Sequence, residues 1–132
     1  YEFHNGEHYS DYRSAYKFSC TYEVFKAGNQ PVQQRCINLP TNCMPQFIHK
    51  ITEEGKFVCK DLEELKESMP STYNFKKSID VGSFYDIAIH NKDNNIIGFI
   101  AIHWFNKNNM KIDEDMIKQL VWYVEEHLLN SK

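Results

Sequence analysis

The sequence contains little glycine and proline, with five and four of them in 132 residues, and every glycine is isolated. A glycine-rich loop that cradles a phosphate is therefore excluded. Long apolar runs are also missing, since none approaches the roughly 18 residues that a membrane-spanning helix needs. No secretory signal peptide is recognisable. The basic residues are scattered and the net charge is −3, which argues against a nucleic acid or a membrane surface as the partner.

The patterns of several enzyme classes and metal sites are absent as well. There is no nucleophile elbow of a serine hydrolase, and the cysteines and histidines lack the spacing of a four-ligand zinc site. His4 and His8 flank an Asn-Gly turn without a third ligand, so we expect exposed turn residues there. Because no CxxC pair occurs, we interpret the cysteines as free thiols of an intracellular protein. They are Cys20, Cys36, Cys43 and Cys59.

The length and composition fit one domain that spans residues 1–132. Hydrophobic residues make up 42% of the chain and aromatic residues 14%, which is enough for a packed core and untypical of disorder. The sequence has no initial Met and opens in a strand-like segment, Tyr1-Glu2-Phe3. We therefore expect an upstream segment outside this sequence. We also expect a cytoplasmic protein, with any membrane tether confined to that upstream segment.

A long β-hairpin is the strongest local prediction. Two apolar, β-branched runs within residues 84–104 flank a loop at residues 91–95 that is rich in Asn and Asp. These residues favour turns because they tolerate left-handed backbone and bond to it with their own side chains. Strands with so few polar positions are covered on both faces. We therefore expect the hairpin to lie in the interior of its sheet.

The rest of the chain predicts shorter elements. Alternation over residues 12–25 indicates a half-buried strand, and residues 32–39 and 57–59 read as short strands. Residues 41–51 fit a short helix with Pro45 in its first turn, and residues 61–69 fit a second helix capped by Asp61. We expect residues 73–82 to be irregular.

A helix over residues 112–128 closes the chain. Asp113 is the expected N-cap, and Glu114 and Asp115 suit the positive end of the helix dipole. The apolar positions recur at three- and four-residue steps, which is typical of an amphipathic helix. They are Met116, Ile117, Leu120, Val121, Val124 and Leu128, with His127 on the same face.

Taken together, these segments resemble a GAF domain, a small-molecule sensor module, over nearly the whole chain. Residues 38–55 look like the family's strand end, short helix and glycine turn, and residues 57–62 like its next strand and Asp-bearing turn. Residues 83–104, with the run IIGFIAIHW, look like its central hairpin, and residues 112–128 like its closing helix. These are fold-level patterns and carry no active-site signature.

The resemblance implies an α+β fold with a central antiparallel sheet of about six strands. Helices would cover one face, and a lid of loops and short helices would cover the other. Family members usually have a helix before the first strand, which this chain lacks. The closing helix would then be short of a partner, and we expect either a homodimer formed through residues 112–128 or a loss of stability without the upstream segment.

The family layout also implies a ligand pocket between the sheet and the lid. We expect a non-enzymatic binding or signalling module that holds a small ligand or a partner chain, with a ligand-free dimerisation unit as the second possibility. Aromatic walls with few polar groups are typical of small-molecule sites. The expected lining is Tyr16, Phe18, Cys20 and Tyr22 on the sheet, with Asn38, Cys43, Phe47, Tyr73, Phe75 and Tyr85 on the lid side.

Departures from the family narrow the choice of cofactor. Asn106-Lys107 and Asp113-Glu114 match parts of a cyclic-nucleotide motif, but the intervening Phe is missing. No neighbouring Cys-His pair is present to which a bilin could be attached. For a haem ligand, His49 is the one candidate in the lid region. We therefore assign no cofactor. An enzymatic branch reduces free methionine sulfoxide with pocket cysteines, and Cys36, Cys43 and Cys59 leave that alternative open, although their spacing differs from the branch's.

Overall fold

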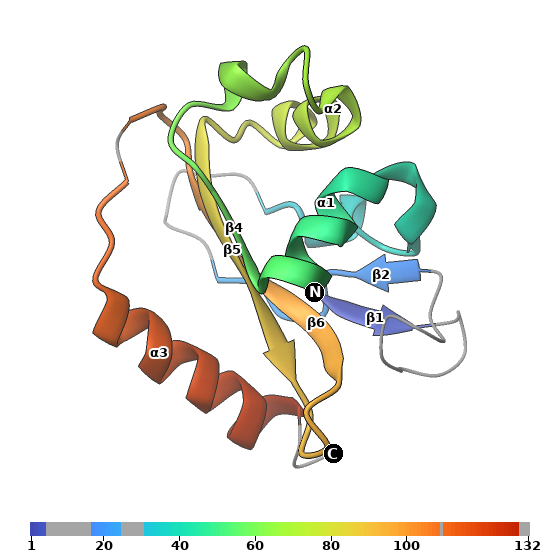
Figure 1. Ribbon diagram of the computed structural model, residues 1–132, viewed down its shortest axis with the longest axis vertical. Helices are drawn as coiled ribbons and strands as arrows, with labels where there is room; N and C mark the ends of the chain where they lie inside the picture. The colour runs from blue at the N-terminus through green and yellow to red at the C-terminus, as the bar shows by residue number, and fades with distance from the viewer. Residues whose placement is uncertain (5–16, 25–30, 109, 130–132) are drawn as a thin grey trace.

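A computed structural model describes residues 1–4, 17–24, 31–108 and 110–129 of the chain (Figure 1). The strands are β1 (Glu2–His4), β2 (Lys17–Ser19), β3 (Leu39–Pro40), β4 (Lys56–Cys59), β5 (Ser83–His90) and β6 (Ile96–Trp104). The α-helices are α1 (Pro45–His49), α2 (Pro70–Ser78) and α3 (Glu114–Tyr123). Single helical turns occur at Gln33–Arg35, Thr41–Cys43 and Leu62–Leu65, and π-helical turns extend α1 over Lys50–Glu54 and α3 over Val124–Leu129.

The six strands form one antiparallel sheet in the order β3-β2-β1-β6-β5-β4. The predicted hairpin is confirmed, because β5 and β6 pair from Ser83 opposite Trp104 to Ile89 opposite Gly98. Both of its strands are interior to the sheet. In the loop, the side chain of Asn91 accepts hydrogen bonds from the backbone N–H groups of Asp93 and Asn95, at 3.0 Å each. The loop residues thus fold the turn with their own side chains, as expected.

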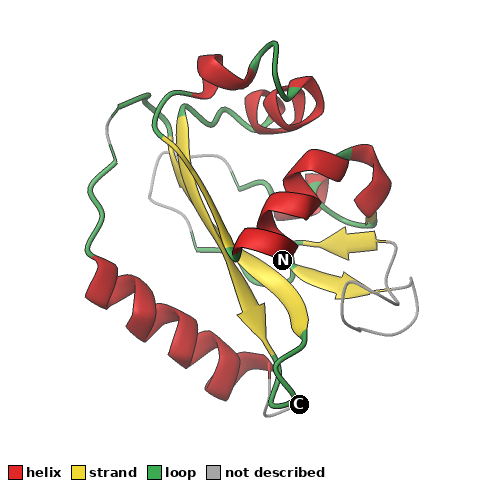
Figure 2. Ribbon diagram, viewed as in Figure 1, coloured by secondary structure: helices red, strands yellow, loops and turns green. Residues whose placement is uncertain are grey.

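The sheet is covered on both faces, which confirms the predicted α+β architecture. Figures 1 and 2 show α3 along one face and α1 and α2 over the other. Successive residues of β5 serve the two sides: Phe84 and Ala88 join the core under α1 and α2, whereas Tyr85 donates a hydrogen bond from its hydroxyl to Glu114 at the start of α3, at 3.1 Å. Strand alternation therefore distributes one segment between two separate packing layers.

Aromatic rings dominate the core between the sheet and α1. Phe99 of β6 lies 5.2 Å from Phe47 of α1 and 5.6 Å from Phe18 of β2, measured between ring centroids. Phe57 meets Phe84 edge-to-face at 5.1 Å. Such tilted and edge-on pairs are the preferred aromatic geometry and add to the free energy gained from burial.

The helix caps agree with the sequence. Asp113 accepts hydrogen bonds from the N–H groups of Asp115 and Met116, and Asp61 accepts one from Glu63. Gly55 ends the α1 segment with a left-handed φ of 82°. Because each cap binds donors that the first turn of a helix leaves unpaired, these positions could be identified without the structure.

Four local predictions were wrong. Residues 73–82 are not irregular, because α2 begins at Pro70, where the missing N–H of proline is harmless, and continues to Ser78. The predicted strand over residues 12–25 ends at Ser19 within the described residues, and residues 32–39 form a helical turn followed by the two-residue β3. His4 is no exposed turn residue, since it ends β1 with 6% of its surface exposed and its Nε2 2.8 Å from the Ser19 hydroxyl. His8 lies outside the described residues.

The four cysteines are unpaired, with Cys43 exposed and the other three buried. In the described part of the chain, no helix combines the length and the apolar character that crossing a bilayer requires.

At Gly98 the backbone of β6 comes close to that of β1, opposite Glu2. A Cβ atom at this position would collide with the carbonyl oxygen of Tyr1 and lie 3.1 Å from the Cα of Glu2. We expect Gly98→Ala to destabilise the fold by about 3 kcal/mol, the upper end of the range for overpacking, because backbone cannot move aside. Gly55→Ala, which has open space and only an unfavourable φ, should cost about 1 kcal/mol. Urea unfolding measures both, and equal losses would contradict the close approach.

Candidate functional site

The predicted pocket lining divides into buried and exposed groups. Phe18, Cys20 and Phe47 are buried in the core under α1 and α2, and Tyr73 and Phe75 of α2 pack against that core while partly exposed. The sheet and its covering helices thus bring these five side chains into one cluster. These side chains pack against one another and occupy the space between the sheet and the helices.

The other predicted lining residues lie elsewhere. Tyr22 is 51% exposed, and Asn38 and Cys43 are also exposed. Tyr85 faces α3 on the opposite side of the sheet from α1 and α2, because it alternates with Phe84 along β5. Tyr16 lies outside the described residues.

Inside the aromatic core lies a cluster of three ionisable side chains that the sequence did not predict. The ammonium of Lys76 on α2 donates hydrogen bonds to Oδ2 of Asp86 on β5, at 2.6 Å, and to Nε2 of His103 on β6, at 2.8 Å. Lys76 and Asp86 have no exposed surface, whereas His103 is partly exposed. We call Lys76, Asp86 and His103 the buried triad.

Local structure explains how these three residues meet. Asp86 lies between Phe84 and Ala88 in the alternation of β5 and so points under α2. His103 pairs with Phe84 across the hairpin, and Ala101 pairs with Asp86, which makes His103 a diagonal neighbour of Asp86 on the same face. The stem of Lys76 reaches this face from above, and its ammonium lies 4.4 Å from the ring centroid of Phe84.

Burial governs the electrostatics of the buried triad. Loss of water raises the pKa of Asp86 and lowers the pKa of Lys76, and the attraction between the two charges opposes each shift only in part. Burial and the adjacent Lys76 hold the pKa of His103 well below its usual value. His103 is therefore a neutral imidazole at pH 7, and its Nε2 accepts the hydrogen bond from the ammonium.

Two buried oxygens, one in the ion pair and one on α2, have no hydrogen-bond partner among the described residues. They are Oδ1 of Asp86 and the hydroxyl oxygen of Thr72, one helical turn before Lys76 on the same face of α2. Leaving a buried polar atom unpaired costs roughly 1–3 kcal/mol. A cluster that combines a buried charge pair with two unpaired acceptors is therefore poor at stabilising a fold, and such costs concentrate at functional sites.

Sequence reasoning missed the buried triad because it read residues 73–82 as irregular and so never placed Lys76 on a helix. One signal was visible: Asp86 interrupts the otherwise apolar strand SFYDIAIH, where a carboxylate can be buried only with a partner. A second signal was Pro70, which starts helices well and puts Thr72 and Lys76 four residues apart on one face.

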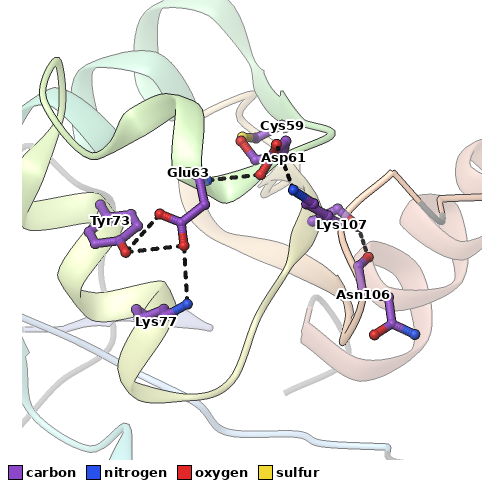
Figure 3. Close-up of polar contacts among 8 residues, drawn as sticks. Cys59, Asp61, Glu63, Tyr73, Lys77, Asn106 and Lys107 are labelled. Carbon is purple, nitrogen blue, oxygen red and sulfur yellow. Dashed lines mark hydrogen bonds and ion pairs between the residues drawn. The ribbon is translucent and has the colours of Figure 1, made fainter.

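A shallow cleft of about 260 Å³ lies at the surface beside α2. It is lined by Asp61, Leu62, Glu63, Lys77, Asp80, Val81, Gly82, Phe105, Asn106 and Lys107. Figure 3 shows how the Tyr73 hydroxyl and the Lys77 ammonium converge on the Glu63 carboxylate, at 2.9 and 3.2 Å. The pKa of Glu63 is lowered most by the hydrogen bond from Tyr73 and next by the hydrogen bond from Lys77.

Most of the charged side chains that line this cleft are paired within the chain. Glu63 is bound by Tyr73 and Lys77, and Asp61 caps the following turn while Lys107 lies 3.9 Å from its Oδ2 (Figure 3). Exposed ion pairs of this kind contribute little to stability or to recognition. Among the described residues, no three side chains of His, Cys, Asp or Glu are arranged to hold a metal ion. The buried triad is therefore the stronger candidate site.

The thiols do not form a reactive pair. Burial raises the pKa of Cys43 and of Cys59, and the thiol of Cys59 donates a hydrogen bond to the carbonyl oxygen of Asp61 at 3.2 Å. Only the thiolate attacks a sulfoxide or a disulfide, so a raised pKa lowers reactivity. This environment gives the methionine sulfoxide reductase alternative no support.

Comparison of the chain with protein-family models, with curated proteins and with solved structures found no match. The resemblance to the GAF family therefore stays a prediction from the sequence. The inference of function rests on the geometry of the fold and of the buried triad.

Paired substitutions can separate a functional role of Lys76 and Asp86 from a structural one. We expect Lys76→Met and Asp86→Leu each to destabilise the protein by about 3–5 kcal/mol, because each leaves one buried charge without its partner. The double variant removes both charges, and partly exposed His103 can then bond to water. Its stability should equal or exceed that of the parent protein. Denaturant unfolding of all four proteins measures this, and a double variant as unstable as the single ones would make the pair a structural element.

Proposed function

We propose that this chain is a sensor domain of the GAF type. It holds a small ligand between the sheet and α1 and α2, with the buried triad as the polar anchor, and passes the effect of binding to its terminal helix. The module is non-enzymatic and acts in the cytoplasm. This proposal is supported by the six-stranded antiparallel sheet, with α3 on one face and α1 and α2 on the other, because the resemblance implies such an architecture.

The observation that carries the proposal is the fully buried ion pair of Lys76 and Asp86 under α2. Removing two charges from water costs several kcal/mol for each ion, and apolar residues would fill the same space at no such cost. The aromatic rings of Phe47, Phe75 and Phe84 lie 4.4–6.0 Å from the ammonium and supply apolar walls. Apolar walls with few convergent polar groups are the usual make-up of a small-molecule site.

Strand β5 provides a route from the ligand to α3. Asp86 faces the proposed ligand, and its neighbour Tyr85 bonds to Glu114 at the start of α3. At the end of the same strand, the N–H of His90 donates to the carboxylate of Glu125 at 2.5 Å. A shift of β5 that follows ligand binding at Asp86 is thereby transmitted to both ends of the terminal helix.

Terminal helix α3 is also the element through which we expect two copies to pair. Ile117 packs on the sheet with 8% of its surface exposed, whereas Met116, Leu120 and Tyr123 remain 65%, 39% and 51% exposed. These three side chains recur at steps of four and three residues, which is the seam of a two-stranded coiled coil. A second copy of the chain presents the same seam, and its symmetric pairing would bury both.

We expect the protein to be a dimer in solution and Leu120→Arg to convert it into a folded monomer. The substitution places a charge in the middle of the seam, and the partly exposed position lets the monomer tolerate it. Size-exclusion chromatography with light scattering measures the mass. Gln119→Arg, at an exposed position on the same helix, is the matched control and should remain dimeric. A monomeric parent protein would contradict pairing through α3.

A ligand screen tests the sensor function. A true ligand present at a hundred times its dissociation constant stabilises the folded state by roughly 2.7 kcal/mol. We expect at least one member of a panel of nucleotides, amino acids, tetrapyrroles and small carbonyl compounds to raise the melting temperature of the protein. The same compound should fail to stabilise the double variant Lys76→Met with Asp86→Leu. A panel without any effect on the parent protein would favour a ligand-free dimerisation unit instead.

A further inference from the structure

The groups around Lys76 are those that a reaction between an amine and a carbonyl compound requires. The ammonium nitrogen has two hydrogen-bonded neighbours, Asp86 at 2.6 Å and the neutral imidazole of His103 at 2.8 Å. Oδ1 of Asp86 is fully buried and bonds to no described atom, so it is available to a bound molecule. A lysine that is desolvated in an apolar environment can act as a nucleophilic amine at neutral pH, and Asp86 is placed to take up the proton that the ammonium must lose.

We propose that the ligand of this domain is a small apolar aldehyde or ketone, which Lys76 holds as an imine. This inference rests on the proposed sensor function, because it names the chemical class of ligand at the same site. The rings of Phe84, Phe47 and Phe75 lie around the nitrogen at 4.4, 5.4 and 6.0 Å and would surround the carbon skeleton of such a ligand. Their apolar surface favours an uncharged molecule over a keto acid.

The bond changes balance without any further reactant. The ammonium of Lys76 transfers one proton to Asp86, and the freed amine attacks the carbonyl carbon while Asp86 returns that proton to the carbonyl oxygen. The nitrogen of the resulting adduct then gives a proton to Asp86. Asp86 passes it to the hydroxyl group, which leaves as water as the carbon–nitrogen double bond forms. The products are a protonated imine, one water molecule and the Asp86 carboxylate, so the ion pair is preserved.

Burial shifts the pKa values of Lys76 and Asp86 in the directions that favour these proton transfers. The pKa of Lys76 is lowered and that of Asp86 is raised, both chiefly by burial, so the neutral amine and the neutral acid are more accessible than in water. His103 keeps the nitrogen in place by accepting one of its hydrogen bonds and acts as a positioning residue. Because Lys76 has no exposed surface, α2 must move from the sheet before a carbonyl compound enters.

Reductive trapping tests the inference on the unmodified protein. The protein is incubated at pH 7 with benzaldehyde and cyanoborohydride, which reduces an imine to a stable secondary amine, and modified lysines are located by peptide mass spectrometry. We expect Lys76 to be modified at least tenfold faster than Lys77, its exposed neighbour, and glyoxylate to show no such preference. The preference should disappear in the Asp86→Asn variant and on prior unfolding in urea.

Each outcome decides one question. Modification confined to Lys77 and other exposed lysines overturns the imine. Equal labelling of Lys76 by benzaldehyde and glyoxylate overturns the preference for an apolar carbonyl compound. The sensor function survives either result if a compound of the thermal panel still stabilises the protein through Lys76 and Asp86. A panel without effect, together with an unmodified Lys76, would end both proposals.

Discussion

The pairing of β5 with β6 is the interaction on which both sides of the molecule depend. Seven residue pairs hold the two strands in one register from Ser83 opposite Trp104 to Ile89 opposite Gly98, before the register shifts at His90. That register decides which side chain of each strand faces α1 and α2 and which faces α3, because strand residues alternate between faces. A slip by one residue would turn Tyr85 toward α1 and α2 in place of Asp86. Asp86 would then face α3, on the opposite side of the sheet from Lys76. The site and the terminal helix are thus both consequences of one register.

The ion pair under α2 is costly compared with the rest of the core. Around it, aromatic rings gain free energy simply by leaving water, and their tilted contacts need no special partners. Lys76 and Asp86 must instead recover what their desolvation costs from their mutual contact and from the hydrogen bond of Lys76 to His103, and Oδ1 of Asp86 recovers nothing from the described residues. A fold of this size has a stability of only about 5–15 kcal/mol. Such a cost is easier to understand as the requirement of a binding site than as a device for stability.

Sequence reasoning succeeded where local chemistry alone decides the structure. The hairpin loop and the caps at Asp61 and Asp113 follow from the hydrogen bonds that Asn and Asp side chains make to nearby backbone. The left-handed Gly55 follows from its missing Cβ atom. It failed after the predicted helix over residues 61–69, because Pro70 begins α2 where an irregular segment was expected to follow. It also failed where alternation stops without a sequence signal, as after Ser19, so that Tyr22 is exposed although it shares the parity of buried Phe18.

The site was harder to predict than the fold because it depends on contacts between distant segments. Lys76 comes from a helix, Asp86 from one strand and His103 from another, and no spacing in the sequence connects the first with the last. Asp86 alone carried a readable signal, since a carboxylate inside an apolar strand demands a cation or a donor.

The position of Asp86 on β5 also bears on how the site could be coupled to α3. Because Asp86 and Tyr85 are adjacent in one rigidly paired strand, a ligand that changes the bonding of Asp86 acts on the strand that α3 rests upon. The proposed coupling between the site under α2 and α3 therefore runs through the backbone of β5 and then through the hydrogen bond between Tyr85 and Glu114.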